Sequence, residues 1–338
     1  MLGGYWDSVA GKLADRFLAL SSQALVFWTG GLLAWAIARG GVRGLDGPER
    51  RLAGYSAPGQ VAVLVVALLL VAASAIAVRR LTFPVLRLLE GYWPWPAGPL
   101  RDRLITSGER RAREARDELQ ELAGPVRDGT ATRQQRDRYV RLDARLRQMP
   151  TTSRLLPTPI GNILRAAESR PADKYGLDPV SLWPHLWLVM PDTARQELAG
   201  ARDALDSSVS AVIWSLLFIA FAVWSPWAVA AGLGVAALTL LVWVPARAAT
   251  FATLVETAFD LYRQDLYVQL RWPLPATPHD ERGEGRRVTT YLVRGSDADT
   301  PVFTSASSAG ESTRQEAEAG RDAAQPDGVP QEDRDQPG

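Results

Sequence analysis

The chain has 338 residues, a formal net charge of +1 from 38 basic and 37 acidic side chains, and a mean hydropathy of −0.07. Such averages are typical of a water-soluble protein of two or three domains. Because cysteine is absent and the only histidines are His185 and His279, the composition excludes a disulfide framework, a zinc–cysteine module and a thiol nucleophile.

These averages hide four apolar segments that carry no charged side chain. The segments are residues 17–38, 59–78, 209–224 and 227–244. A helix needs about 20 mainly apolar residues to cross a bilayer. The sequence therefore predicts an all-α integral membrane protein with four transmembrane helices in two hairpins, the second hairpin closed by the turn Trp224-Ser225-Pro226-Trp227.

Two other interpretations compete with this one. Residues 17–38 end in Ala36-Ile37-Ala38, which resembles a signal-peptide cleavage site, but the region before them carries Asp7 and Asp15, which signal peptides rarely do. A water-soluble all-helical core is the second alternative. It would require unusually complete burial of all four segments.

The positions of Lys and Arg near the span ends indicate the orientation. Most basic residues fall on the side that the termini would share with the middle of the chain: Lys12, Arg16, Arg79, Arg80, Arg87, Arg195, Arg202 and Arg247. The loop of the first hairpin disagrees, because it holds Arg39, Arg43, Arg50 and Arg51. We expect a multi-pass protein of the plasma (inner cell) membrane with both termini cytoplasmic.

The expected organisation follows from these spans. It consists of a first transmembrane hairpin at 1–80, a helical cytoplasmic region at 81–206, a second hairpin at 207–246, an amphipathic cytoplasmic segment at 247–294 and a disordered acidic tail at 295–338. The tail is rich in Ser, Gly, Pro and acidic residues and cannot bury enough apolar surface to offset its ordering entropy. A binding role for the tail stays open.

Within 81–206 the sequence predicts a helical hairpin. Thr106-Ser107-Gly108-Glu109 has the spacing of a capping box and would open a helix to about Leu122, and Thr132-Arg133-Gln134-Gln135 would open a second to about Met149. Their apolar residues form two narrow seams that should pack together. The seams are Ala115, Leu119 and Leu122 in one helix, and Tyr139, Leu142, Leu146 and Met149 in the other.

An arginine cluster in the first of these helices admits two interpretations. Arg110, Arg111, Arg113 and Arg116 could contact anionic lipid or nucleic acid, but acidic residues interrupt the cluster. A mixed-sign helix face is more typical of a solvated, ion-paired surface. We therefore expect no nucleic-acid partner.

Three further helices are predicted before the second hairpin. Thr158-Pro159 and Asp178-Pro179 each place a capping side chain before a proline at the first helical position, and a helix of about 33 residues should run from Asp192 to Trp224. Asp178 and His185 lie seven residues apart on one helix face, as an acid/base pair could. The capping role of Asp178 is the simpler explanation.

The sequence contains no recognisable catalytic, cofactor-binding or metal-binding motif. The four spans contain no ionisable residue, which argues against an ion-coupled carrier. Ala228, Ala230, Gly232, Gly234 and Ala236 would let helices approach closely. Phe251, Leu254, Val255, Ala258, Tyr262 and Leu266 predict an amphipathic helix ending by Trp272-Pro273.

Several short segments carry a resemblance. They are Leu156-Pro157-Thr158-Pro159-Ile160-Gly161-Asn162-Ile163-Leu164-Arg165-Ala166-Ala167-Glu168, Tyr175-Gly176-Leu177-Asp178, Leu182-Trp183-Pro184 and Trp272-Pro273-Leu274-Pro275. They resemble recurrent segments of uncharacterised multi-span membrane proteins from GC-rich actinobacteria. The resemblance implies an integral membrane protein and transfers no site residues.

The function expected from the sequence is a scaffold or signalling component that acts through its helical cytoplasmic region. Its expected partners are the lipid bilayer and either another protein or further copies of the chain. The alternative is a channel or membrane-perturbing effector built from the small-residue faces. We expect no cofactor and no enzymatic activity, since the Asp178–His185 pair is the only catalytic candidate.

Overall fold

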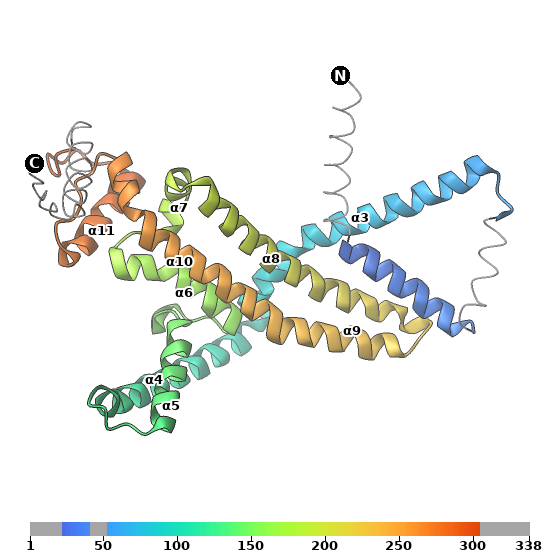
Figure 1. Ribbon diagram of the computed structural model, residues 1–338, viewed down its shortest axis with the longest axis horizontal. Coiled ribbons are helices and arrows are strands. Elements are labelled where there is room, and N and C mark those ends of the chain that lie inside the picture. The colour runs from blue at the N-terminus through green and yellow to red at the C-terminus, as the bar shows by residue number, and fades with distance from the viewer. Residues whose placement is uncertain (1–21, 41–52, 305–338) are drawn as a thin grey trace, which may run out of the picture. The chain divides into compact units, whose positions relative to one another are not determined.

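The structure is a computed structural model that describes residues 22–40 and 53–304, and in these residues every regular element is a helix (Figure 1). The all-α prediction is confirmed for this part of the chain. The chain forms two compact units: unit 1 is Met1–Arg170 with Asp192–Thr257, and unit 2 is Pro171–Pro191 with Ala258–Gly338.

Three helical stretches of the chain are long and apolar enough to cross a membrane: Ala57–Arg127, Asp192–Val223 and Trp227–Gln269. These stretches contain the second, third and fourth of the expected spans and indicate a membrane protein. The first expected span is an apolar helix over Ser22–Ala38 in the described residues, shorter than the other three stretches. Residues 17–21 of that span lie outside the described residues.

The apolar stretches consist of the following elements. They are α3 (Ala57–Glu90), α8 (Asp192–Phe218) with a 3₁₀ turn over Ile219–Val223, α9 (Trp227–Leu238), a π-helical turn over Thr239–Trp243, and α10 (Val244–Gln269). The expected long helix from Asp192 is therefore confirmed to Val223. Pro226 precedes α9, and the turn from Trp224 to Pro226 separates α8 from α9 as predicted.

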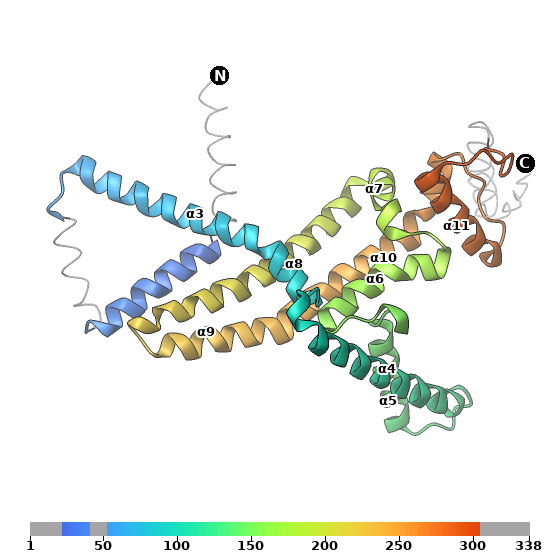
Figure 2. The same cartoon turned by 180° about the vertical axis from the view of Figure 1, so that it is seen from behind.

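The N-terminal half of α3 exposes its apolar side chains. Val61 and Leu64 are each 59% exposed, and Leu69 is 63% exposed. Figures 1 and 2 both show this part of α3 extending away from the other apolar helices of unit 1. An apolar patch of this size is unusual on a soluble protein and is typical of a surface that faces lipid or a partner.

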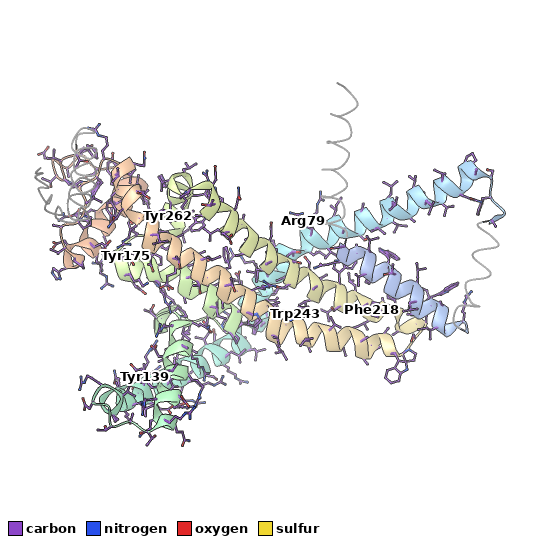
Figure 3. The ribbon with its side chains drawn as sticks, in the orientation of Figure 1. Arg79, Tyr139, Tyr175, Phe218, Trp243 and Tyr262 are labelled. Carbon is purple, nitrogen blue, oxygen red and sulfur yellow. The ribbon has the colours of Figure 1, made fainter. Side chains whose placement is uncertain are left out.

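The helix over Ser22–Ala38 packs on the α8–α9 hairpin through aromatic rings. The Phe27 ring contacts the rings of Trp214 and Phe221 with centroid separations of 4.8 and 4.9 Å. The ring of Phe218, labelled in Figure 3, also contacts the Phe27 ring, with a centroid separation of 6.4 Å. A Cβ atom at Gly31 would lie 2.2 Å from the Phe221 ring, so a larger residue at this position would displace that ring.

Small residues hold α9 against α8. Ala228, Gly232 and Ala236 recur every four residues and are buried, whereas Ala230 and Gly234 are exposed. A Cβ atom at Gly232 would lie 2.7 Å from the carbonyl oxygen of Ser215. The predicted packing face is therefore confirmed for the first set and not for the second.

The predicted helical hairpin is formed by α4 (Gly98–Arg127) and α5 (Arg133–Arg147). The predicted start of α4 was wrong, because Thr106 and Ser107 lie inside the helix and donate to the carbonyls of Asp102 and Arg103. Its predicted end at about Leu122, before Gly124-Pro125, was also wrong. A proline in the last turn removes a single hydrogen bond, and α4 continues to Arg127.

The start of α5 is confirmed by a complete capping box. Thr132 Oγ1 accepts from Gln135 N, and Gln135 Oε1 accepts from Thr132 N at 2.8 Å. The two helices pack along the predicted seams, where Ala115 and Leu142 are buried. Tyr139, labelled in Figure 3, belongs to this seam.

Unit 2 contains the ends of α6 (Pro159–Tyr175) and α10 together with α7 (Pro179–Val189) and α11 (Pro278–Arg294). The predicted proline starts of α6 and α7 are confirmed. The expected amphipathic segment 247–294 divides into two helices, with Thr277 capping α11.

The expected tail begins inside the described residues. Residues 295–304 are irregular, and Thr304 N donates to the carbonyl of Arg271 at 2.9 Å. The Phe303 ring contacts the Trp272 and Tyr291 rings at 6.3 and 6.0 Å. These contacts hold Phe303 and Thr304 against the rest of unit 2. Residues 305–338 of the expected tail lie outside the described residues.

Candidate functional site

The structure places the sequence-predicted pair, Asp178 and His185, on α7. Asp178 caps this helix, because its Oδ2 accepts from Ser181 N at 3.3 Å and from Ser181 Oγ at 2.6 Å. His185 Nδ1 is buried and has no hydrogen-bond partner among the described residues. Within the same residues no hydrogen bond joins Asp178 to His185, so the pair is not assembled for proton transfer.

Two arginines of the α4 cluster form ion pairs with neighbouring carboxylates. Arg113 Nη2 lies 3.3 Å from Glu109 Oε2, and Arg110 Nε lies 3.9 Å from Glu114 Oε1. The carboxylate of Glu118 accepts from both Nε and Nη2 of Arg138 on α5, at 2.7 and 2.9 Å. These contacts support the interpretation of a solvated, ion-paired face.

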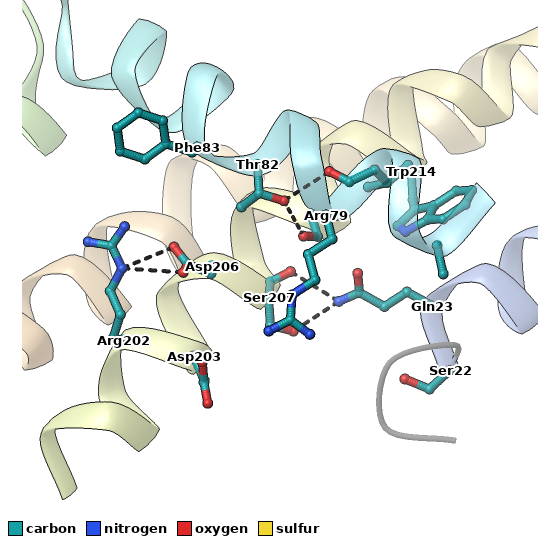
Figure 4. Close-up of a pocket in the computed structure, with 13 residues that line it drawn as sticks. Ser22, Gln23, Arg79, Thr82, Phe83, Arg202, Asp203, Asp206, Ser207 and Trp214 are labelled. Carbon is teal, nitrogen blue, oxygen red and sulfur yellow. Dashed lines mark hydrogen bonds and ion pairs between the residues drawn. The ribbon is translucent and has the colours of Figure 1, made fainter. Parts of the chain in front are cut away.

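A polar cavity of about 430 Å³ lies in unit 1 between three apolar helices (Figure 4). The helix over Ser22–Ala38 contributes Ser22 and Gln23, α3 contributes Arg79 and Thr82, and α8 contributes the remaining polar groups. Those groups are Arg202, Asp203, Asp206, Ser207 and Ser210. Arg79 follows the charge-free part of α3 and Asp206 precedes that of α8, so the cavity lies at one end of both apolar segments.

Hydrogen bonds between the helices hold the walls of this cavity. Gln23 Nε2 donates to the carbonyl oxygen of Ser207 at 3.0 Å and to Ser207 Oγ at 2.9 Å. The hydroxyls of Thr82 and Ser210 share a hydrogen bond of 2.8 Å. These contacts join the first helix and α3 to α8, and the dashed lines of Figure 4 mark them.

The charges in the cavity are only partly compensated. Asp206 is paired with Arg202, whose Nε lies 3.2 Å from Oδ1 and 3.3 Å from Oδ2. Arg79 and Asp203 form no ion pair with any described residue. The cavity therefore presents one guanidinium and one carboxylate that are available to a ligand.

An apolar groove of about 470 Å³ adjoins the polar cavity, because Ser22, Gln23 and Trp214 line both. The groove lies between the first helix, α8 and α9. Its other lining residues include Val26, Phe27, Phe218, Ala231 and Val235. A site with a polar end and an apolar extension suits an amphipathic ligand.

A second polar cluster lies in unit 2 and stabilises its helix packing. Arg263 Nε lies 2.6 Å from Glu281 Oε1, and both side chains are more than four-fifths buried. The guanidinium of Arg263 stands 4.3 Å from the centre of the Tyr175 ring. Tyr175 donates to Asp260 Oδ1 at 2.6 Å, and burial with this hydrogen bond raises the pKa of Tyr175 to about 12.

Neither cluster has the composition of a metal site. In the described parts of the chain, no group of three or more His, Asp or Glu side chains converges as metal ligands. Among the described residues, no hydrogen bond joins the Ser207 or Ser210 hydroxyl to Asp203 or Asp206.

Sequence reasoning missed the polar cavity. It used Arg79 and Arg202 only as markers of orientation and did not interpret Gln23 or Asp203. The available signal was the occurrence of polar residues beside the charge-free segments of helices that pack together. The sequence alone does not show which helices pack together.

Comparisons of the chain with protein-family models, with curated proteins and with solved structures found no match.

Proposed function

We propose that the chain is a multi-pass plasma-membrane protein that acts as a scaffold or signalling component through its helical cytoplasmic region. The observation that carries this proposal is the α4–α5 hairpin. Its apolar seam is closed by its own two helices and by the Arg138–Glu118 pair. The outer faces of the hairpin therefore remain available to a protein partner or to another copy of the chain.

The proposed orientation rests on the basic residues that flank the apolar segments. Arg79, Arg80 and Arg202 lie beside the ends of the apolar parts of α3 and α8, whereas the turn between α8 and α9 has no charge. Basic side chains are enriched on the cytoplasmic side of bacterial and eukaryotic membrane proteins. This distribution supports cytoplasmic termini and a cytoplasmic α4–α5 hairpin.

The test is affinity purification of the full-length chain from mild detergent. The matched variant reverses three exposed charges of α5 that form no ion pair with any described residue, as Arg133→Glu, Arg136→Glu and Arg141→Glu. The control replaces the same three residues with lysine. We expect a protein partner or defined oligomer that the lysine variant keeps and the glutamate variant loses. A monomer without partner in every sample would contradict the proposal.

A second candidate function is a channel or membrane-perturbing effector. One observation favours it: Ala230 and Gly234 form an exposed small-residue face on α9 that no described helix covers. Such faces bring membrane helices into close contact between chains. Leakage from liposomes that Gly234→Leu abolishes would support this function, and intact liposomes at every protein density would remove it.

A further inference from the structure

We propose that the polar cavity and the apolar groove of unit 1 together bind one phospholipid whose headgroup carries a phosphate and a primary ammonium. The cavity would hold the headgroup and the groove one acyl chain. This inference requires insertion into a membrane but no protein partner of α4–α5. Its failure and the failure of the proposed function are therefore distinguishable.

The depth of the site fits a lipid headgroup. Arg79 directly follows the apolar segment of α3, and Asp203 and Asp206 come just before that of α8. The Thr82–Ser210 hydrogen bond holds these two boundaries at the same level. Apolar segments end where the hydrocarbon ends, so the polar cavity lies at the level of the headgroups.

The dimensions of the site fit one amphiphile. The two compartments measure about 430 and 470 Å³, within the range of small-molecule sites, and they share Gln23 and Trp214 as a common wall. Trp214, which forms part of this wall, is only 8% exposed. A water-soluble phosphate ester would fill only the polar compartment and would leave the adjoining groove without an occupant.

The charges select the headgroup. The Arg79 guanidinium, which in Figure 4 extends from α3 toward Gln23 and Ser207, can pair with a phosphate. Ser207 Oγ accepts from Gln23, so its own hydroxyl proton is free for the same phosphate. Asp203 is left to accept from an ammonium. A headgroup with phosphate alone would leave Asp203, which is exposed, paired only with water, and a quaternary ammonium offers no N–H donor.

The experiment uses the full-length protein in detergent and native mass spectrometry with equimolar lipids of matched acyl chains. The three probes are phosphatidylethanolamine, phosphatidylcholine and phosphatidylglycerol. We expect the phosphatidylethanolamine adduct to dominate by about tenfold, the ratio that a difference of about 1.4 kcal/mol produces. Equal adducts of all three lipids would overturn the proposal.

Charge variants test the two headgroup contacts. Arg79→Gln should weaken all three adducts by about tenfold, and Arg79→Lys should restore most of the loss. Asp203→Asn should remove the preference for phosphatidylethanolamine while the phosphatidylglycerol adduct is kept. Unfolding temperatures of the variants check that the fold is intact. Undiminished adducts in folded Arg79→Gln, or an unchanged preference for phosphatidylethanolamine in folded Asp203→Asn, would overturn the assignment.

Groove variants separate a lipid from a soluble ligand. Ala231 lines the groove and is exposed, so Ala231→Phe should fill the groove and reduce every lipid adduct. Ala230 is exposed on the same helix but does not line the groove, and Ala230→Phe is the matched control. Glycerophosphoethanolamine, which has no acyl chain, should not compete. Full competition by glycerophosphoethanolamine would overturn the lipid assignment. Equal lipid binding by Ala231→Phe and Ala230→Phe would also overturn it.

Discussion

The apolar helices of unit 1 and the helices of unit 2 place polar and apolar side chains differently. In unit 1 apolar side chains such as Leu64 and Leu69 face outward, while hydroxyls and amides such as Ser207 and Gln23 meet between the helices. In unit 2 Phe259 and Tyr267 are buried at the centre, and charged pairs surround them. The difference is the one expected when the apolar helices of unit 1 are solvated by hydrocarbon and unit 2 is solvated by water.

The largest effect is expected from breaking the ion pair of unit 2. Glu281→Ala leaves the mostly buried guanidinium of Arg263 without its carboxylate, and should cost about 3 kcal/mol of unfolding free energy. Hydrogen exchange of the α11 amides measures the loss. Glu114→Ala removes an exposed carboxylate and should change stability by less than about 0.5 kcal/mol. If both variants changed the unfolding free energy by similarly small amounts, the Arg263–Glu281 ion pair would not stabilise unit 2.

A pair of glycines in α11 tests the packing of unit 2. A Cβ atom at Gly285 would lie 1.9 Å from the Tyr175 carbonyl oxygen, so Gly285→Ala should cost about 2 kcal/mol. Gly283 has open space around it, and Gly283→Ala should stabilise the helix by about 0.5 kcal/mol or more. Both are measured by hydrogen exchange. Stabilisation by both alanines would show that α11 does not pack on Tyr175.

The same substitution applied to α9 tests the packing of unit 1. A Cβ atom at Gly232 would lie 2.7 Å from Ser215 O and 2.9 Å from Ile219 Cγ1, so Gly232→Ala should cost about 1 to 2 kcal/mol. Gly234→Ala meets no atom and serves as the control. Thermal unfolding in detergent reports the difference. Equal melting of the two variants would mean that α8 and α9 are not in close contact.

The smallest effect concerns the tyrosine hydrogen bond of unit 2. Tyr175→Phe removes the bond to Asp260 and should cost about 1 kcal/mol at neutral pH. Because the pKa of Tyr175 is raised to about 12 by burial, the folded state keeps its proton after the unfolded chain has lost it near pH 10. Stability should therefore fall as pH rises from about 10 to 12.

The phenylalanine variant should lose part of this pH dependence. Melting temperatures of the wild type and Tyr175→Phe, measured at about pH 9 and about pH 11.5, give the comparison. The difference in melting temperature between the wild type and Tyr175→Phe should be smaller at the higher pH. A difference in melting temperature that is the same at both pH values would show that folded Tyr175 does not keep its proton at the higher pH.

The helices were largely predictable because their signals are local. The charge-free segments, the capping box at Thr132 and the proline starts at Pro159 and Pro179 each depend on a few neighbouring residues. The boundaries of α4 were not predictable in this way, since Thr106 bonds backward inside the helix with the same side chain that can cap one.

The candidate site was not predictable, because it depends on contacts between distant segments. Gln23 and Ser207 lie 184 positions apart, and Thr82 and Ser210 lie 128 apart. No periodicity in one helix indicates which polar residue of another helix it will meet. The acid/base pair of Asp178 and His185 shows the converse case, since two residues on one helix face can have unrelated contacts.

The most direct test of the central claim is single-cysteine labelling in intact cells with a membrane-impermeant maleimide. The chain has no cysteine, so Ser225→Cys in the α8–α9 turn and Thr130→Cys in the α4–α5 loop report without background. If α8 crosses the membrane, Ser225→Cys should react in intact cells and Thr130→Cys only after permeabilisation. Equal labelling of both cysteines from the same side would contradict a membrane-spanning α8.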